Sequence, residues 1–162
     1  MEYIYSCEKY DSRNKCIGYL IADESEFISS PPYLHSFKNR MSNKNYCVIS
    51  DNIGIPMPYL SLDSKLIIGT SQFIYFFDAI LEHIEYILLS SPCTVIEKFY
   101  KIIIVICECD VTFISLSDVH IIATFAFDDV ITDYSISSES MYIYLIEKGE
   151  KKLDITPYYL RG

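Results

Sequence analysis

Residues 101–116 read KIIIVICECDVTFISL, and this stretch decides the fold expected for the chain. Ile102–Cys107 is a continuous β-branched run, which is typical of a strand buried on both faces. Glu108-Cys-Asp110 is expected to form a turn into a second strand at Val111–Leu116. A link this short indicates antiparallel neighbours, because a parallel pair needs a crossover of a dozen or more residues.

The same pattern continues to the end of the chain. Runs of β-branched and aromatic residues alternate with short links that carry Asp, Ser or Gly-Glu-Lys-Lys, and they predict strands at 119–127, 130–136, 141–147 and 153–156. The composition agrees, because the chain has 15 Tyr, 9 Phe and many Ile but very little Ala. Strand should therefore dominate the fold.

The segment at about 71–90 has a different periodicity. Its apolar residues recur at spacings of three and four, which predicts one long amphipathic helix. Thr70 or Ser71 is placed to cap its start, and Pro92 lies just beyond its end. Three carboxylates, Asp78, Glu82 and Glu85, lie off the apolar stripe.

The N-terminal part gives weaker signals. Short strands are expected at 3–5 and 17–22, joined as a hairpin, with another strand at 46–50. Residues 31–45 are polar and basic and are expected to form a loop. The chain shows no internal repeat and no linker. The sequence therefore predicts a single α+β domain over 1–162, in which the helix packs on a mostly antiparallel sheet.

The charge is strongly one-sided. The net charge is −9, and no Lys or Arg lies between Lys101 and Lys148. A surface built from this stretch repels nucleic acid and anionic lipid and attracts a basic partner. The candidate partner-binding residues are the carboxylates at predicted turns, one tyrosine anchor and the acids of the predicted helix: Asp128, Asp129, Asp133, Glu108, Asp110, Tyr134, Asp78, Glu82 and Glu85. Tyr142 and Tyr144 are further candidate anchors.

Several other classes of function lack support in the residues. The start of the chain does not resemble a secretory signal, and no run reaches about 18 uncharged apolar residues. We therefore expect a soluble, cytoplasmic protein without a membrane partner, in which the six cysteines are reduced thiols. Cys107 and Cys109 could share one face of a strand, but a zinc site needs four ligands. No metal and no cofactor are expected.

One pair of residues suggests catalysis. Asp118 and His120 could share a strand face and form a carboxylate–histidine pair of the kind used in general base catalysis. No nucleophile motif and no phosphate-binding loop accompany them. The pair is more simply interpreted as a structural hydrogen bond, and the chain as a protein without enzymatic activity.

In size, charge and composition the chain resembles the immunity proteins that bacteria encode beside polymorphic or contact-dependent toxins. This resemblance implies a non-catalytic, cytoplasmic inhibitor that binds one cognate toxin, commonly a basic nuclease. Three alternatives stay open: a host-interaction protein of an AT-rich virus, a small enzyme that uses Asp118 and His120, and a subunit of a stable assembly. The sequence leaves the oligomeric state undetermined.

Overall fold

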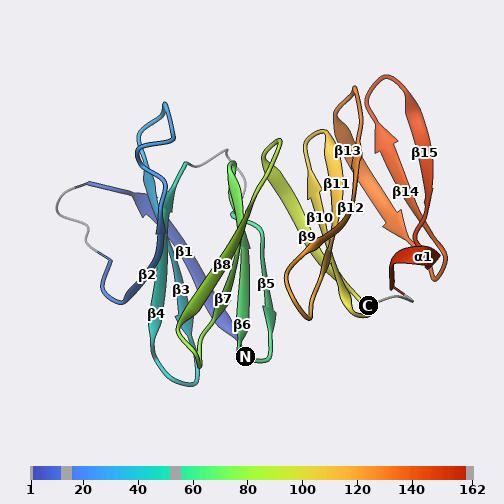
Figure 1. The fold of residues 1–162 in the computed structure, drawn as a ribbon. Coiled ribbons are helices and arrows are strands. Elements are labelled where there is room, and N and C mark those ends of the chain that lie inside the picture. The colour runs from blue at the N-terminus through green and yellow to red at the C-terminus, as the bar shows by residue number, and fades with distance from the viewer. Residues whose placement is uncertain (1, 12–15, 52–55, 160–162) are drawn as a thin grey trace. The chain divides into compact units, whose positions relative to one another are not determined.

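A computed structural model describes residues 2–11, 16–51 and 56–159 of the chain (Figure 1). These residues form fifteen strands and one helix, α1 (Thr156–Tyr159), which has four residues. The predicted α+β class is therefore wrong, because the fold is nearly all β. The strands form four small sheets.

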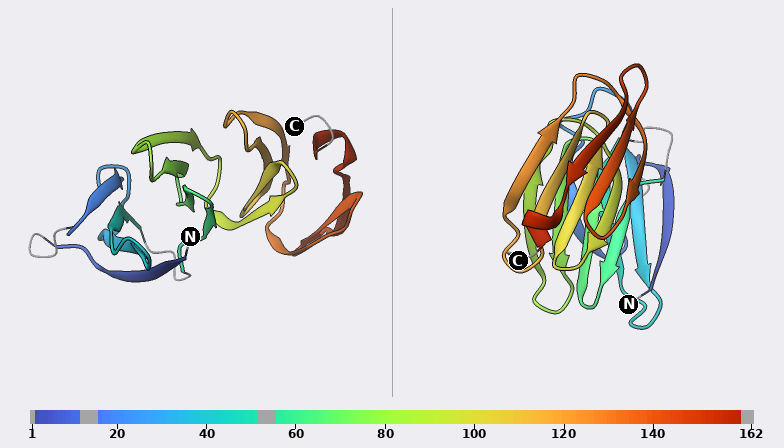
Figure 2. Two further views of the ribbon diagram at one scale, coloured as in Figure 1. Left: turned by 90° about the horizontal axis from the view of Figure 1, so that it is seen from below. Right: turned by 90° about the vertical axis from the view of Figure 1, so that its right-hand side faces the viewer.

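The chain divides into two compact units, Met1–Ile87 and Leu88–Gly162, which we call unit 1 and unit 2. In each unit two sheets appear as separate layers (Figure 2). In unit 1 the first sheet has the order β1-β3-β4-β2 and the second has the order β5-β6-β7-β8. Their strands are β1 (Tyr3–Lys9), β2 (Tyr19–Asp23), β3 (Tyr33–Asn39), β4 (Asn45–Ser50), β5 (Tyr59–Leu62), β6 (Lys65–Gly69), β7 (Phe73–Asp78) and β8 (His83–Leu88).

The first sheet differs from the sequence prediction in two ways. β1 pairs with β3 and β2 pairs in parallel with β4, so the expected β1–β2 hairpin is wrong. The expected loop at 31–45 contains β3. Its polar His35 is only 1% exposed, and its ring nitrogens bond the hydroxyl of Tyr5 at 2.8 Å and the carbonyl oxygen of Asp51 at 3.0 Å. Because these bonds satisfy the imidazole, a polar residue can occupy the interior of a strand here.

The predicted helix at 71–90 is two strands, β7 and β8, joined by a turn. Residues 74–77 are buried without interruption, which suits a central strand with both faces covered. The carboxylate of Asp78 accepts backbone hydrogen bonds from Ile80 at 2.9 Å and Leu81 at 3.1 Å. A helix N-cap makes the same kind of bond, so the residue types at this turn imitate a helix start. The segment just beyond the predicted helix is also a strand, β9 (Cys93–Phe99).

Alternating side chains of both sheets form the core of unit 1. The first sheet contributes Tyr3, Phe37, Tyr46 and Val48, and the second contributes Leu66, Ile68, Tyr75 and Phe77. In the same unit, the carboxylate of Glu24 is only 1% exposed and accepts hydrogen bonds from three hydroxyls. The two sheets of unit 1 are thus joined by both apolar packing and a buried polar cluster.

Unit 2 confirms the strands expected over 101–147, whereas the strand expected at 153–156 instead covers Gly149–Asp154 and includes the expected Gly-Glu-Lys-Lys link. One sheet has the order β12-β11-β10-β9 and the other the order β13-β14-β15. The additional strands are β10 (Ile102–Cys107), β11 (Asp110–Ser115), β12 (Ile121–Ala126), β13 (Ile131–Ile136), β14 (Ser140–Leu145) and β15 (Gly149–Asp154). Neighbouring strands within each sheet pair antiparallel, as their short links predict, and every residue of β10 is buried.

The core of unit 2 also lies between its two sheets. Ile102, Ile104 and Ile106 of β10 share it with Met141 and Ile143 of β14. Because side chains alternate along a strand, Tyr142 and Tyr144 of β14 point to the opposite face of their sheet. This alternation creates the tyrosine face described below.

Candidate functional site

The acidic residues expected to bind a partner are divided between the two units. Asp128, Asp129, Asp133 and Glu108 belong to unit 2, whereas Asp78, Glu82 and Glu85 belong to unit 1. Several of these carboxylates are already engaged in holding turns or ion pairs. Their individual positions decide which of them can bind another protein.

Asp128 and Asp129 organise the link between β14 and β15. The side chain of Asp128 forms an ion pair with Lys148, and this bond lowers the pKa of the Asp128 carboxyl. Asp129 accepts backbone hydrogen bonds from Glu147 at 2.8 Å and from Lys148 at 2.9 Å, which lower its pKa. The fold therefore brings a cation onto the segment that has none in sequence, and the expected uncompensated acidic cluster is wrong at this point.

Asp110 lies in the interior and cannot contribute to an exposed surface. Its side chain is among the buried polar groups, at 3% exposure. The hydroxyls of Ser90 and Ser91 donate to its Oδ2 at 2.6 and 2.9 Å, and the hydroxyl of Thr112 lies 3.4 Å from its Oδ1. Its neighbour in the turn, Glu108, is exposed.

Tyr134 is a structural contact rather than an open anchor. Its hydroxyl donates a 2.7 Å hydrogen bond to Glu97 of β9, which joins the two sheets of unit 2. Burial and this bond to a carboxylate raise the pKa of Tyr134 to about 12. Its exposure is intermediate, so only part of the ring is accessible.

The β13-β14-β15 sheet instead exposes two rows of side chains in register. In the first row Tyr144 lies between its cross-strand partners Asp133 and Glu150. In the second row Tyr142 lies between Ser135 and Lys152, and the Lys152 ammonium is 5.7 Å from the centre of the Tyr142 ring. Both tyrosines are half-buried, while their four neighbours are exposed. We call these six residues the tyrosine face.

The sequence contained a signal for this face. Met141, Tyr142, Ile143, Tyr144 and Leu145 alternate between core and surface, and this alternation alone places both tyrosines together. The cross-strand neighbours of the tyrosines could not be read from the sequence. They depend on the register that the turns set.

Asp118 and His120 form the expected pair, but they lie in the turn between β11 and β12 and do not share a strand face. His120 Nδ1 is 2.7 Å from Asp118 Oδ1, and the hydroxyls of Ser115 and Ser117 also donate to that carboxylate. These bonds, that of Ser115 first, lower the pKa of Asp118. Both members of the pair are more than half exposed, so water screens them and no desolvated reaction site surrounds them.

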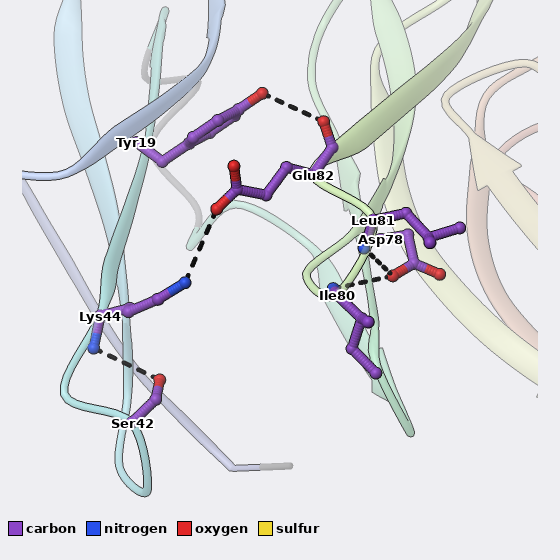
Figure 3. Close-up of polar contacts among 7 residues, drawn as sticks. All are labelled: Tyr19, Ser42, Lys44, Asp78, Ile80, Leu81 and Glu82. Atoms are coloured by element: carbon purple, nitrogen blue, oxygen red, sulfur yellow. Dashed lines mark hydrogen bonds and ion pairs between the residues drawn. The ribbon is translucent and has the colours of Figure 1, made fainter.

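The acids of the predicted helix are spread over a turn and an edge strand. Asp78 holds the β7–β8 turn, and its bonds to the amides of Leu81 and Ile80 lower its pKa. Glu85 lies on β8, 3.6 Å from the imidazole of His83. Glu82 lies 3.6 Å from the Lys44 ammonium, and its carbonyl accepts a 3.3 Å hydrogen bond from Tyr19. Figure 3 shows Glu82 reaching toward Lys44, whereas Ile80 and Leu81 point away from it.

Two of the six cysteines depart from the expectation of reduced thiols, and the other four are free. Cys16 and Cys47 form a disulfide with their Cα atoms 6.1 Å apart, which ties the segment before β2 to β4. Cys107 is buried opposite Cys93 of the neighbouring strand, and this pairing with burial raises the pKa of the Cys107 thiol. Among the described residues, no group of three or more His, Cys, Asp or Glu side chains could hold a metal ion.

Within the ranges that the structure describes, no helix has the length and hydrophobicity that a membrane-spanning segment requires. No protein-family profile and no curated protein sequence matches this chain. Solved structures do match it in fold. The computationally designed Ika4 protein aligns at 12% identity with a TM-score of 0.53, over 65% of this chain and 69% of that protein.

Two natural structures are also similar. Sqt1 of Saccharomyces cerevisiae aligns at 10% identity with a TM-score of 0.57, over 76% of this chain and 41% of Sqt1. The Neurospora crassa Pan2 WD40 domain aligns at 12% identity with a TM-score of 0.51, over 93% of this chain and 52% of that domain. The chain thus spans about half the length of these two proteins or less. What it shares with them, one of which is a WD40 domain, is a fold of successive small and mostly antiparallel sheets.

Proposed function

We propose that this chain is a non-catalytic protein-binding module and that the tyrosine face binds a basic partner. The row Asp133–Tyr144–Glu150 carries the proposal, because it places one aromatic ring between two exposed carboxylates. Tyrosine is enriched at interfaces, since its ring adds contact area and its hydroxyl adds a polar handle. Carboxylates on both sides of the ring favour a Lys or Arg that lies over it.

The finer form of the proposal is an immunity function. In that case the basic partner is a toxin, such as a nuclease, and the carboxylates occupy the positions at which the toxin holds phosphates. Electrostatic steering would raise the association rate to about 10⁸ M⁻¹s⁻¹ at low salt. Support for this form comes from the net charge of −9 and from the composition.

Affinity purification with the tagged full chain, followed by a binding titration with each purified protein that it retains, tests the proposal. We expect a basic protein that binds the wild-type chain. The double variant Asp133→Lys with Glu150→Lys should bind that protein at least about tenfold more weakly. Glu139→Lys with Glu147→Lys is the matched control, because it changes the net charge equally and both residues are exposed in the same unit outside the tyrosine face. Equal loss in the control would attribute binding to net charge alone, and no loss in the variant of Asp133 and Glu150 would rule out this face.

The immunity form needs a separate readout. Expression of the retained partner alone should arrest growth of the host cell, and co-expression of this chain should restore it. Tyr144→Ala should abolish the rescue while leaving the amount of folded protein unchanged. A partner that binds through the tyrosine face without toxicity would leave the binding module intact and refute the immunity form.

A further inference from the structure

Unit 1 contains two adjoining hollows that the tyrosine face does not involve. The smaller, of about 190 Å³, is lined by Met41 and Ala79 among others, and the larger, of about 460 Å³, by Tyr19 and Glu82 among others. Lys44 and Tyr46 line both hollows. We call the two hollows together the Lys44 groove.

The floor of the Lys44 groove is fixed by packing. Tyr46 is 3% exposed, and its ring centre lies 4.9 Å from that of Phe77 and 6.5 Å from that of Tyr19. The turn beside it is held by Asn39, whose side-chain oxygen accepts backbone hydrogen bonds from residues 41 and 42 at 2.9 and 3.0 Å. A site that is already formed loses little conformational entropy when it binds a ligand.

Two large apolar side chains that line the groove are open to solvent. Met41 is 87% exposed, and Ile17, which lines the larger hollow, is 86% exposed. Ile80 and Leu81, in the turn between Ala79 and Glu82, point away from Lys44 and do not line either hollow (Figure 3). Exposed apolar groups that gather at one place on a domain mark an interaction site.

The segment that supplies Lys44 to the groove is basic, although its Arg40 forms an ion pair with Glu2 at 3.0 Å. Residues 38–45 contain Lys38, Arg40 and Lys44 and no carboxylate, although the net charge of the chain is −9. The Lys44 ammonium lies 3.6 Å from the carboxylate of Glu82, and both side chains are more than half exposed. Such an exposed pair is weak, so a carboxylate from a ligand can replace Glu82 on Lys44.

We propose that the Lys44 groove binds an extended acidic segment of a partner protein. A carboxylate of the segment pairs with Lys44, and apolar side chains on either side of that carboxylate occupy the two hollows. This surface belongs to unit 1 and selects a charge opposite to the one that the tyrosine face selects. The proposal therefore stands independently of the proposed function.

Fluorescence anisotropy with short labelled peptides and the full chain tests the proposal. The acidic probe is Gly-Ser-Leu-Glu-Leu-Ser-Gly, and the matched control probe has Lys in place of Glu. Wild type should bind the acidic probe at least about tenfold more tightly, because only that probe can pair with Lys44. Lys44→Glu should reverse this preference, whereas Lys101→Glu, an exposed lysine of unit 2, should leave it unchanged.

A second variant guards against a folding defect in Lys44→Glu. Glu82→Gln removes the competing carboxylate without changing the shape of the side chain, so it should tighten binding of the acidic probe by a few fold. Replacing both Leu residues of the probe by Ser should abolish binding. Equal binding of the two charged probes, an equal effect of Lys101→Glu, or no effect of Glu82→Gln would each overturn the proposal.

Discussion

The hydroxyl of Tyr75 donates a 2.8 Å hydrogen bond to the carboxylate of Glu24 in the interior of unit 1. Thr70 donates to the same oxygen at 2.8 Å, and Ser50 donates to the other at 2.5 Å. These donors come from β4, β7 and the segment between β6 and β7, so a single carboxylate connects both sheets of the unit. Burial raises the pKa of Glu24, although the three hydroxyl bonds oppose the rise.

The raised pKa makes the stability of unit 1 depend on pH. Between the ordinary Glu pKa of 4.5 and the higher pKa of folded Glu24, the native state binds more protons than the unfolded state. Protonated Glu24 therefore contributes its full share to the free energy of unfolding below about pH 4.5, and this contribution is lost as the pH rises through the folded pKa. Glu24→Gln cannot ionise, so its unfolding free energy should improve relative to wild type as the pH rises from about 4.5. Urea denaturation from acid to neutral pH measures this difference.

Two further variants separate charge from hydrogen bonding. Glu24→Leu leaves buried hydroxyls unpaired and should cost about 2–4 kcal/mol at every pH. Glu26→Gln, which changes an exposed carboxylate two residues away, should follow wild type. If the unfolding free energies of Glu24→Gln and wild type differed by the same amount at every pH, the raised pKa of Glu24 would be contradicted.

The strands that the sequence predicted correctly are those with unambiguous residue types. Every position of β10 is buried, so each is occupied by a β-branched residue or Cys and no helical pattern arises. β7 is also buried over 74–77, but it runs into a turn whose Asp78 bonds amides two and three residues ahead. An apolar run followed by such a turn has the same spacing as an amphipathic helix, so local pattern could not separate the two.

The pairing of strands from distant segments could not be predicted from the sequence either. β2 pairs in parallel with β4, and β3 lies between them in the sequence, so the nearest-neighbour hairpin was the wrong choice. The ion pair of Asp128 with Lys148 joins residues twenty positions apart, and it forms only because the turn between β14 and β15 lies beside that between β12 and β13. Charge along the sequence therefore overstated the acidity of the folded surface.

The disulfide between Cys16 and Cys47 gives a direct test of the cysteine chemistry. It closes a loop with a sequence separation of 31, and a cross-link of that size stabilises a fold by about 2–4 kcal/mol. Dithiothreitol, or Cys16→Ser, should therefore lower the Tm of the purified protein. Cys7→Ser, at an exposed cysteine outside the disulfide, is the control. Thiol alkylation under denaturing conditions should find two more reactive cysteines after reduction, and an unchanged number would refute the bond.

Val119 is the clearest case of backbone strain, because a β-branched residue here has a φ of 52°. L-residues in this region are destabilised by about 1–2 kcal/mol, and glycine is not. Val119→Gly should therefore raise the unfolding free energy by up to about 1 kcal/mol, after the extra entropy of the unfolded chain is subtracted. Val119→Asn, which tolerates this conformation, should act in the same direction. Chemical denaturation is the measurement, and Val130→Gly, with no such strain, should destabilise instead.

Gly18 has the opposite role, because the space around it excludes any side chain. A Cβ atom there would lie 2.1 Å from the carbonyl oxygen of Asn45, at the point where β2 begins its parallel pairing with β4. Gly18→Ala must push these strands apart, and we expect a loss of about 3 kcal/mol or more in unfolding free energy. Gly149→Ala is a matched control, because Gly149 also has a positive φ, of 68°, but a Cβ atom there would meet no described atom within 4 Å. The control should lose only about 1 kcal/mol, from backbone conformation alone.

The same substitution connects stability to binding. Gly18 lines the larger hollow of the Lys44 groove, so a displaced β2 also moves Tyr19 away from the carbonyl of Glu82. We expect Gly18→Ala to bind the acidic probe more weakly than wild type does, even at temperatures where the variant is still folded. Gly149→Ala, in unit 2, should bind the probe as wild type does. Equal losses of stability in the two variants would show that the close approach of Gly18 to Asn45 is absent in solution.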